Sequence, residues 1–157
     1  MADFYQAQEF VKKAEGGYSN DPRDKGNYVD GLLIGTNHGI SAPILKVWLG
    51  RTPSVAEMKG LSYKTALNIY KNNFWDELGL SGINNQSLAL LIYDGAVNQG
   101  VTKIRRVIID SLNDVGVKAS AGDSTQDLVR KINSAPEHRI YEKVKQNRRA
   151  SYSKNSP

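Results

Sequence analysis

Two carboxylate side chains, Glu15 and Asp24, lie nine positions apart across a glycine-rich turn. Glu15 ends an amphipathic stretch and directly precedes Gly16 and Gly17, whereas Asp24 lies in a polar loop. A carboxylate in the last turn of a helix faces the partial negative charge of unpaired carbonyl groups, and apolar neighbours disfavour its ionised form. Both effects raise the pKa of a carboxyl group, so we expect Glu15 to stay protonated near neutral pH and Asp24 to stay ionised.

A protonated carboxyl group opposite an ionised one is suited to cleaving a glycosidic bond. The acid protonates the leaving oxygen, and in many such enzymes the second carboxylate activates water or stabilises the cation that forms. The spacing alone leaves a second explanation open for Asp24, because aspartate is common in turns, where its side chain accepts hydrogen bonds from the backbone.

The elements that must position this pair are predicted to be mostly helical. Apolar residues recur at helical spacing from about residue 4 to Glu15. Further helices are expected over residues 41–49, 54–60, 62–79, 87–99 and 102–112, and around 128–132 and 140–144. Ser54 and Glu57 form the pattern of a capping box. Gly95 lies within the strongly apolar helix 87–99, where we expect it to permit close approach of a neighbour.

One short β-hairpin is the only strand candidate. Residues 28–29 and 32–34 have β character and are joined by Asp30 and Gly31, the typical pair for a tight two-residue turn. After residue 112 a polar, glycine-containing connection follows. We therefore expect a main domain over residues 1–112, with a small helical segment, residues 113–157, packed on it.

Composition excludes several classes of protein and site. Apolar residues make up 39% and charged residues 24% of the 157 residues, as in ordinary soluble globular proteins. There is no cysteine, and the two histidines, His38 and His138, lack the spacing of a metal site. The N-terminus does not resemble a signal peptide, no segment is apolar enough to span a membrane, and no nucleotide-binding motif occurs. We expect neither a metal nor a cofactor, and no membrane insertion.

Positive charge is concentrated at the C-terminal end. The net charge of the chain is +5. Residues 139–157 contain one acidic residue, Glu142, and six basic residues: Arg139, Lys143, Lys145, Arg148, Arg149 and Lys154. Such a segment can bind an anionic cell-wall polymer, nucleic acid or anionic lipid. A solvated helix face with a frayed tail explains the same pattern.

Three motifs resemble a known family. Residues 15–24, EGGYSNDPRD, resemble the signature of the family 108 glycoside hydrolases, the N-acetylmuramidases of phages and bacteria that include the secretion activator proteins. Residues 36–41, TNHGIS, are similar to the family's Thr-Asn-Tyr-Gly-Ile-Thr element. Residues 94–100, DGAVNQG, are similar to its Asp-x-Ala-Val-Asn-x-Gly helix end. The resemblance covers nearly the whole chain.

This resemblance implies a mainly α, lysozyme-like helical domain with a small β-hairpin wing and a short C-terminal peptidoglycan-binding segment. Glu15 matches the family's catalytic acid. The Glu-x8-Asp spacing is also similar to the lysozymes of T-even phages, in which the acid, an aspartate and a following threonine cooperate; Asp24 and Thr36 match those positions. The family usually runs from Asp-Pro-Gly-Gly directly to this threonine, whereas residues 25–35 intervene here. We therefore expect an enlarged wing.

A sugar cleft needs aromatic faces and amide groups to orient its ligand. The candidates for substrate binding are Tyr18, Asn37, His38, Tyr70, Trp75, Asn98 and Gln99. Aromatic residues at helical spacing, such as Tyr70 and Trp75, are more often part of the core. A single histidine in a loop, such as His38, is usually exposed to solvent without binding a ligand. Asn98 and Gln99 precede a glycine at a helix end, so capping is the competing explanation for them.

Together these features predict a muramidase that cleaves the β-1,4 bond between N-acetylmuramic acid and N-acetylglucosamine of peptidoglycan, as a phage endolysin or phage-related release enzyme. A lytic transglycosylase and a noncatalytic cell-wall-binding or phage-tail structural protein stay open as alternatives. A nucleic-acid-binding module is the weakest alternative, because it rests on charge alone. We expect a monomer made in the bacterial cytoplasm, which reaches the wall through a holin, a phage tail or a secretion system.

Overall fold

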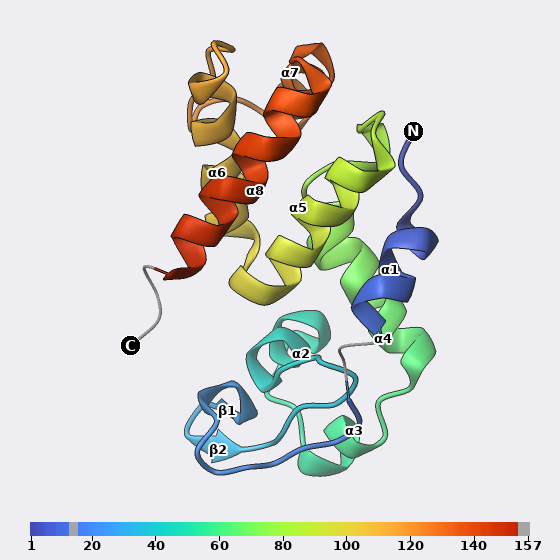
Figure 1. Ribbon diagram of the computed structural model, residues 1–157. Coiled ribbons are helices and arrows are strands. Elements are labelled where there is room, and N and C mark those ends of the chain that lie inside the picture. The colour runs from blue at the N-terminus through green and yellow to red at the C-terminus, as the bar shows by residue number, and fades with distance from the viewer. Residues whose placement is uncertain (13–15, 154–157) are drawn as a thin grey trace. The chain divides into compact units, whose positions relative to one another are not determined.

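The computed structural model describes residues 1–12 and 16–153 and is mainly α-helical (Figure 1). Within these residues the α-helices are α1 (Phe4–Lys12), α2 (Ala42–Leu49), α3 (Val55–Lys59), α4 (Tyr63–Tyr70), α5 (Gln86–Gln99), α6 (Val101–Asp114), α7 (Thr125–Ser134) and α8 (Glu137–Ser153). The strands are β1 (Tyr28–Val29) and β2 (Leu32–Leu33), and the short turns are η1 (Lys25–Asn27), η2 (Lys71–Trp75) and η3 (Leu80–Gly82). The predicted class, mainly α with a small β-hairpin, is confirmed.

The chain forms two compact units. The helical unit comprises Met1–Phe10 and Tyr70–Pro157, and the hairpin unit comprises Val11–Ile69. Within the helical unit, α8 packs against both α5 and α6. The division into a main domain over residues 1–112 and a packed segment over residues 113–157 stays a prediction. The peptidoglycan-binding role of residues 113–157 stays a prediction.

The β-hairpin has the tight form that its sequence predicts. Strands β1 and β2 pair antiparallel, with Tyr28 opposite Leu33. Asp30 and Gly31 between them adopt φ values of 52° and 75°, the left-handed conformation of a two-residue hairpin turn. The turn is also held from outside, since the Asp30 carboxylate accepts hydrogen bonds from the Thr52 hydroxyl and, at 2.9 Å, from Lys46 Nζ of α2. Both bonds lower the pKa of Asp30, and the bond from Thr52 has the larger effect.

The helix ends in the hairpin unit follow local capping rules. The Ser54 hydroxyl accepts from the Glu57 backbone N–H at 3.0 Å, and the Glu57 carboxylate accepts from the Ser54 N–H at 2.9 Å, which is the predicted capping box of α3. Helix α2 ends at Gly50, which adopts the left-handed conformation with φ 75°.

Two helices differ from their predicted bounds. The single helix expected over residues 62–79 becomes α4 followed by η2, a π-helical turn in which the Asp76 N–H donates to the Lys71 carbonyl at 2.7 Å. Helix α5 begins earlier than expected because Asn85, outside the predicted range, accepts from the Leu88 N–H at 2.9 Å.

Helices α5, α6 and α8 pack against one another in the helical unit (Figure 1). A methyl group on Gly95 of α5 would lie 2.7 Å from Ile104 Cδ1 and 3.1 Å from Arg148 Cδ. The expected close approach at Gly95 is therefore confirmed. None of the helices in residues 1–12 and 16–153 is both long and apolar enough to cross a membrane.

Candidate functional site

The predicted acid Glu15 lies outside the described residues, as does the predicted end of the first helix over residues 13–15. The other predicted catalytic residues, Asp24 and Thr36, are both described and both belong to the hairpin unit.

Two of the sequence motifs meet through their backbones. The Ser19 N–H donates to the Thr36 carbonyl and the Thr36 N–H donates to the Ser19 carbonyl, each at 2.8 Å. This isolated antiparallel bridge joins the motif at residues 15–24 to the motif at residues 36–41. The part of the first motif after the glycines therefore lies beside Thr36.

Asp24 is exposed at the start of η1, where it acts as the N-cap. One carboxylate oxygen, Oδ1, accepts from the Gly26 N–H at 2.9 Å. The turn explanation for this aspartate is thus correct as far as Oδ1 is concerned. The other oxygen, Oδ2, has no partner among the described residues, so it can accept a hydrogen bond from water or substrate.

Asn27 connects Asp24 to Thr36, a role that the sequence alone did not reveal. Its side chain is completely buried, and its Oδ1 accepts from the Thr36 hydroxyl at 2.6 Å. Its backbone N–H donates to the Asp24 carbonyl at 3.1 Å, and its Nδ2 donates to the Asp21 carbonyl at 3.0 Å. The only sequence signal was a turn at residues 25–27, which predicts backbone shape and not a buried side chain.

Tyr18 is held by contacts on its ring and at its hydroxyl. The hydroxyl donates to the Ile34 carbonyl at 2.9 Å. The ring lies so close to Gly35 that a methyl group there would be 2.6 Å from Tyr18 Cε1. The Lys59 ammonium lies 5.5 Å from the ring centroid, within cation–π range. Tyr18 is half-buried, so part of its surface is available to a ligand.

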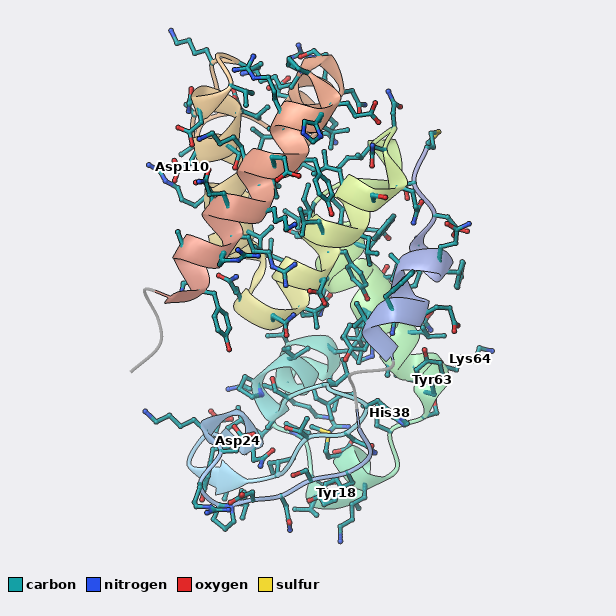
Figure 2. The ribbon with its side chains drawn as sticks, viewed as in Figure 1. Tyr18, Asp24, His38, Tyr63, Lys64 and Asp110 are labelled. Carbon is teal, nitrogen blue, oxygen red and sulfur yellow. The ribbon has the colours of Figure 1, made fainter. Side chains whose placement is uncertain are left out.

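The predicted binding residues Asn37 and His38 have different surroundings. The Asn37 amide is buried and donates to the carbonyls of Met58 and Lys59 at 2.9 and 3.2 Å, which fastens the loop to the end of α3. His38 is half-buried with φ 51°, a conformation uncommon for a residue other than glycine. Its ring packs edge-on against Tyr63, with centroids 5.7 Å apart (Figure 2). His38, and not Asn37, has side-chain surface that a ligand can reach.

Tyr70 and Trp75 belong to the core of the helical unit, with exposed fractions of 1% and 0%. Trp75 packs edge-on against Phe4 and Tyr93, with centroids 5.6 and 5.5 Å apart, and its Nε1 donates to the Ser81 hydroxyl at 2.8 Å. Rings so buried offer no face to a sugar, so the core explanation holds for both in this structure.

Asn98 and Gln99 lie at the end of α5, in the helical unit. The Asn98 amide donates to the Asp94 carbonyl at 2.9 Å, and the Gln99 amide donates to the Arg148 carbonyl at 3.2 Å. The Asp94 carboxylate forms an ion pair with Arg148 of α8. The motif at residues 94–100 is therefore fastened to α8.

No three histidine, cysteine, aspartate or glutamate side chains among the described residues are placed to hold one metal ion.

Comparison with known proteins identifies a family match over the region that contains these motifs. A model of the glycosyl hydrolase 108 family matches residues 8–100 of this chain. Among solved structures, that of Brucella abortus SagA is similar, with 29% sequence identity and a TM-score of 0.73 over 98% of this chain and 80% of that chain. No curated protein sequence matches the chain. The similarity over nearly the whole chain confirms the predicted lysozyme-like, mainly helical fold.

Proposed function

The chain belongs to the glycosyl hydrolase 108 family, and from this premise we propose that it is an N-acetylmuramidase. Membership makes it a glycoside hydrolase of the peptidoglycan-degrading kind. The bond we propose is the β-1,4 linkage between N-acetylmuramic acid and N-acetylglucosamine. The observation that carries this proposal is that the family match over residues 8–100 contains Glu15, Asp24 and Thr36 within their motifs.

In the proposed reaction Glu15 protonates the glycosidic oxygen, while Asp24 positions water or stabilises the oxocarbenium-like transition state. The exposure of Asp24, and an Oδ2 atom that no described residue contacts by a hydrogen bond, support this role. The Thr36 hydroxyl donates its hydrogen bond to Asn27 Oδ1, so toward a water molecule it acts as an acceptor. In this proposal, Thr36 and Asp24 both contact the water molecule that attacks the sugar.

Substrate binding is proposed for those candidates that have accessible surface. In the hairpin unit these are Tyr18 and His38, with the ring of Tyr63 supporting His38. The hydrophobic faces of such rings stack on sugars, and their polar edges bind hydroxyl or N-acetyl groups.

The biological setting is also a proposal. We propose a monomeric phage endolysin or phage-related release enzyme, made in the bacterial cytoplasm and delivered to the wall by a holin, a phage tail or a secretion system. The basic face of α8 supports attraction to an anionic wall.

The test is clearing of purified cell walls, followed by mass spectrometry of the released muropeptides. The Glu15→Gln protein should lose clearing by about a hundredfold or more, since general acid catalysis contributes ~10²–10⁴-fold. Glu9→Gln, an exposed glutamate of α1, is the matched control and should clear normally.

The products separate the remaining alternatives. Reducing muramic acid ends support hydrolysis, whereas 1,6-anhydro ends would identify a lytic transglycosylase. Unchanged clearing by Glu15→Gln would remove Glu15 as the acid, and absence of clearing by the unmodified protein would favour a noncatalytic wall-binding or tail protein.

A further inference from the structure

Lys59, the last residue of α3, is an exposed cation with a defined position. Its ammonium lies over the ring of Tyr18, 5.5 Å from the ring centroid, where a cation–π interaction is favourable. No carboxylate in residues 1–12 and 16–153 forms an ion pair with it. An ammonium has three hydrogen-bond donors, so Lys59 can bind an anion while it stays in contact with the ring.

Other cations of the hairpin unit have carboxylate partners within it. The ion pairs are Arg23 with Asp21, Lys46 with Asp30, and Arg51 with Glu57. Of the carboxylates that the structure describes in this unit, only that of Asp24 has no ion pair. Lys59 therefore differs from these three cations, because an aromatic ring positions its charge and no described carboxylate neutralises it.

Two contacts connect Lys59 and Tyr18 to the neighbours of Thr36. The Tyr18 ring packs so closely on Gly35 that a methyl group there would lie 2.6 Å from its Cε1. The Lys59 backbone carbonyl accepts from the Asn37 side-chain amide at 3.2 Å. The Lys59 side chain thus begins beside the residue after Thr36 and ends over a ring that contacts the residue before it. Its charge belongs to the surroundings of this proposed catalytic residue.

An unpaired cation is unfavourable close to the sugar that the proposed reaction cleaves. Positive charge develops on that sugar in the transition state, and like charges repel. A carboxylate on the substrate that binds the Lys59 ammonium would remove this repulsion and form a charge-assisted hydrogen bond. Muramic acid carries a lactyl carboxyl group, and the stem peptide attached to that group carries further carboxylates. N-acetylglucosamine is neutral.

We infer that Lys59 is a specificity-determining residue, which binds a carboxylate on the muramic acid side of the glycan. It thereby favours peptidoglycan over neutral glycans built from N-acetylglucosamine alone, since specificity is a difference between two affinities. The inference rests on the proposed function for the identity of the polymer. The carboxylate belongs either to the lactyl group of a peptide-free muramic acid or to the stem peptide, and Tyr18 holds the ammonium that binds it.

The experiment measures binding of soluble glycan strands to the full chain by calorimetry, in a Glu15→Gln background so that the ligand is not consumed. The ligands are peptide-free strands with lactyl carboxylates, peptide-bearing strands, and both kinds after amidation of their carboxylates. Lys59→Gln should weaken binding of a carboxylate-bearing strand about fivefold or more, because a charge-assisted hydrogen bond is lost. Binding of the amidated strands should change less than about twofold. Lys59→Arg, which keeps the charge, should retain most of the affinity.

The two sources of the carboxylate give different results. Weakening with the peptide-free strands alone assigns the lactyl carboxylate, and weakening with the peptide-bearing strands alone assigns the stem peptide. The matched control is Lys64→Gln, which removes the same charge from an exposed position on α4, apart from Tyr18 in Figure 2. It should change binding less than about twofold at the same ionic strength. Thermal unfolding verifies that each variant is folded.

Three results would overturn the inference. Equal weakening with carboxylate-bearing and amidated strands would mean that Lys59 only supports Tyr18. Equal weakening by Lys64→Gln would indicate a general effect of charge, and unchanged binding by Lys59→Gln would remove any role in recognition. Wall clearing by the protein with Glu15 intact is measured separately. Absence of clearing together with Lys59-dependent binding contradicts the proposed function and not this inference, whereas clearing without Lys59-dependent binding contradicts the inference alone.

Discussion

The hydroxyl of Thr36 donates a 2.6 Å hydrogen bond to the buried side-chain oxygen of Asn27. Asn27 also donates from its backbone to the Asp24 carbonyl and accepts, through its own carbonyl, from the N–H groups of Ile34 and Gly35. Asn27 thus contacts both residues proposed to hold the attacking water, Thr36 through its side chain and Asp24 through its backbone. The eleven residues that enlarge the wing, 25–35, include this support.

Replacing Asn27 should therefore affect stability and activity together. Asn27→Ala leaves the Asp21 carbonyl without its donor and removes the acceptor of Thr36, so we expect unfolding free energy to fall by ~1–3 kcal/mol. Wall clearing should fall more than the folded fraction does. Denaturant unfolding and clearing rates are the measurements, with the exposed Asn68→Ala as control. Full activity in folded Asn27→Ala would contradict a positioning role.

Gly35 is expected to tolerate no side chain because of Tyr18. Its φ of 101° is itself unfavourable for alanine, and a methyl group would lie 2.6 Å from the Tyr18 ring. Gly31→Ala is the matched control, since Gly31 also has a positive φ of 75° but nothing lies within 4 Å of its added methyl group. We expect Gly35→Ala to be the more destabilising by ~1–3 kcal/mol in urea unfolding. Equal losses for the two variants would show that the ring contact is unimportant.

Gly95→Ala should change the stability of the protein through two effects of opposite sign. Alanine gains ~1 kcal/mol over glycine in a helix interior, whereas overpacking a core typically loses ~1–3 kcal/mol. Because the methyl group would lie 2.7 Å from the buried Ile104, we expect a net loss of stability. Gly122→Ala, in an exposed loop with its nearest neighbour at 3.8 Å, should be nearly neutral. A melting temperature of Gly95→Ala above that of the unmodified protein would show that the Ile104 and Arg148 side chains can move aside for the methyl group.

The capping box of α3 predicts a pH dependence. Hydrogen bonds lower the pKa of Glu57 from 4.5 to about 2. The bond from the Arg51 side chain has the largest effect, and the bond from the Ser54 backbone comes next. A carboxyl group whose pKa is lower in the folded state contributes stability above its unfolded pKa and loses it as pH falls through the folded value. This contribution should therefore be present above pH 4.5 and decline between pH 4.5 and 2. Urea unfolding across that range, compared with Glu57→Gln, measures it; the difference between the two proteins should shrink toward pH 2.

Some features of this protein were determined by residues close together in the sequence. Asp30 and Gly31 dictate the two-residue turn, and Ser54 with Glu57 dictates the start of α3, because each interaction spans at most three residues. The same is true of Gly50 at the end of α2, where only the local backbone conformation matters. The identity of Glu15 as the predicted acid also rests on sequence, since it lies outside the described residues.

Tertiary structure decided the features that join distant segments. Periodicity cannot distinguish a ring that faces a cleft from one that faces the core, so only the packing against Phe4 and Tyr93 shows that Trp75 is buried. The ion pair of Asp94 with Arg148 spans 54 positions. The bond between Asn27 and Thr36 spans only nine, but it forms because the hairpin folds back between them. Local sequence determines turns and caps through short-range hydrogen bonds, whereas the partner of a buried side chain depends on which segments the completed fold brings into contact.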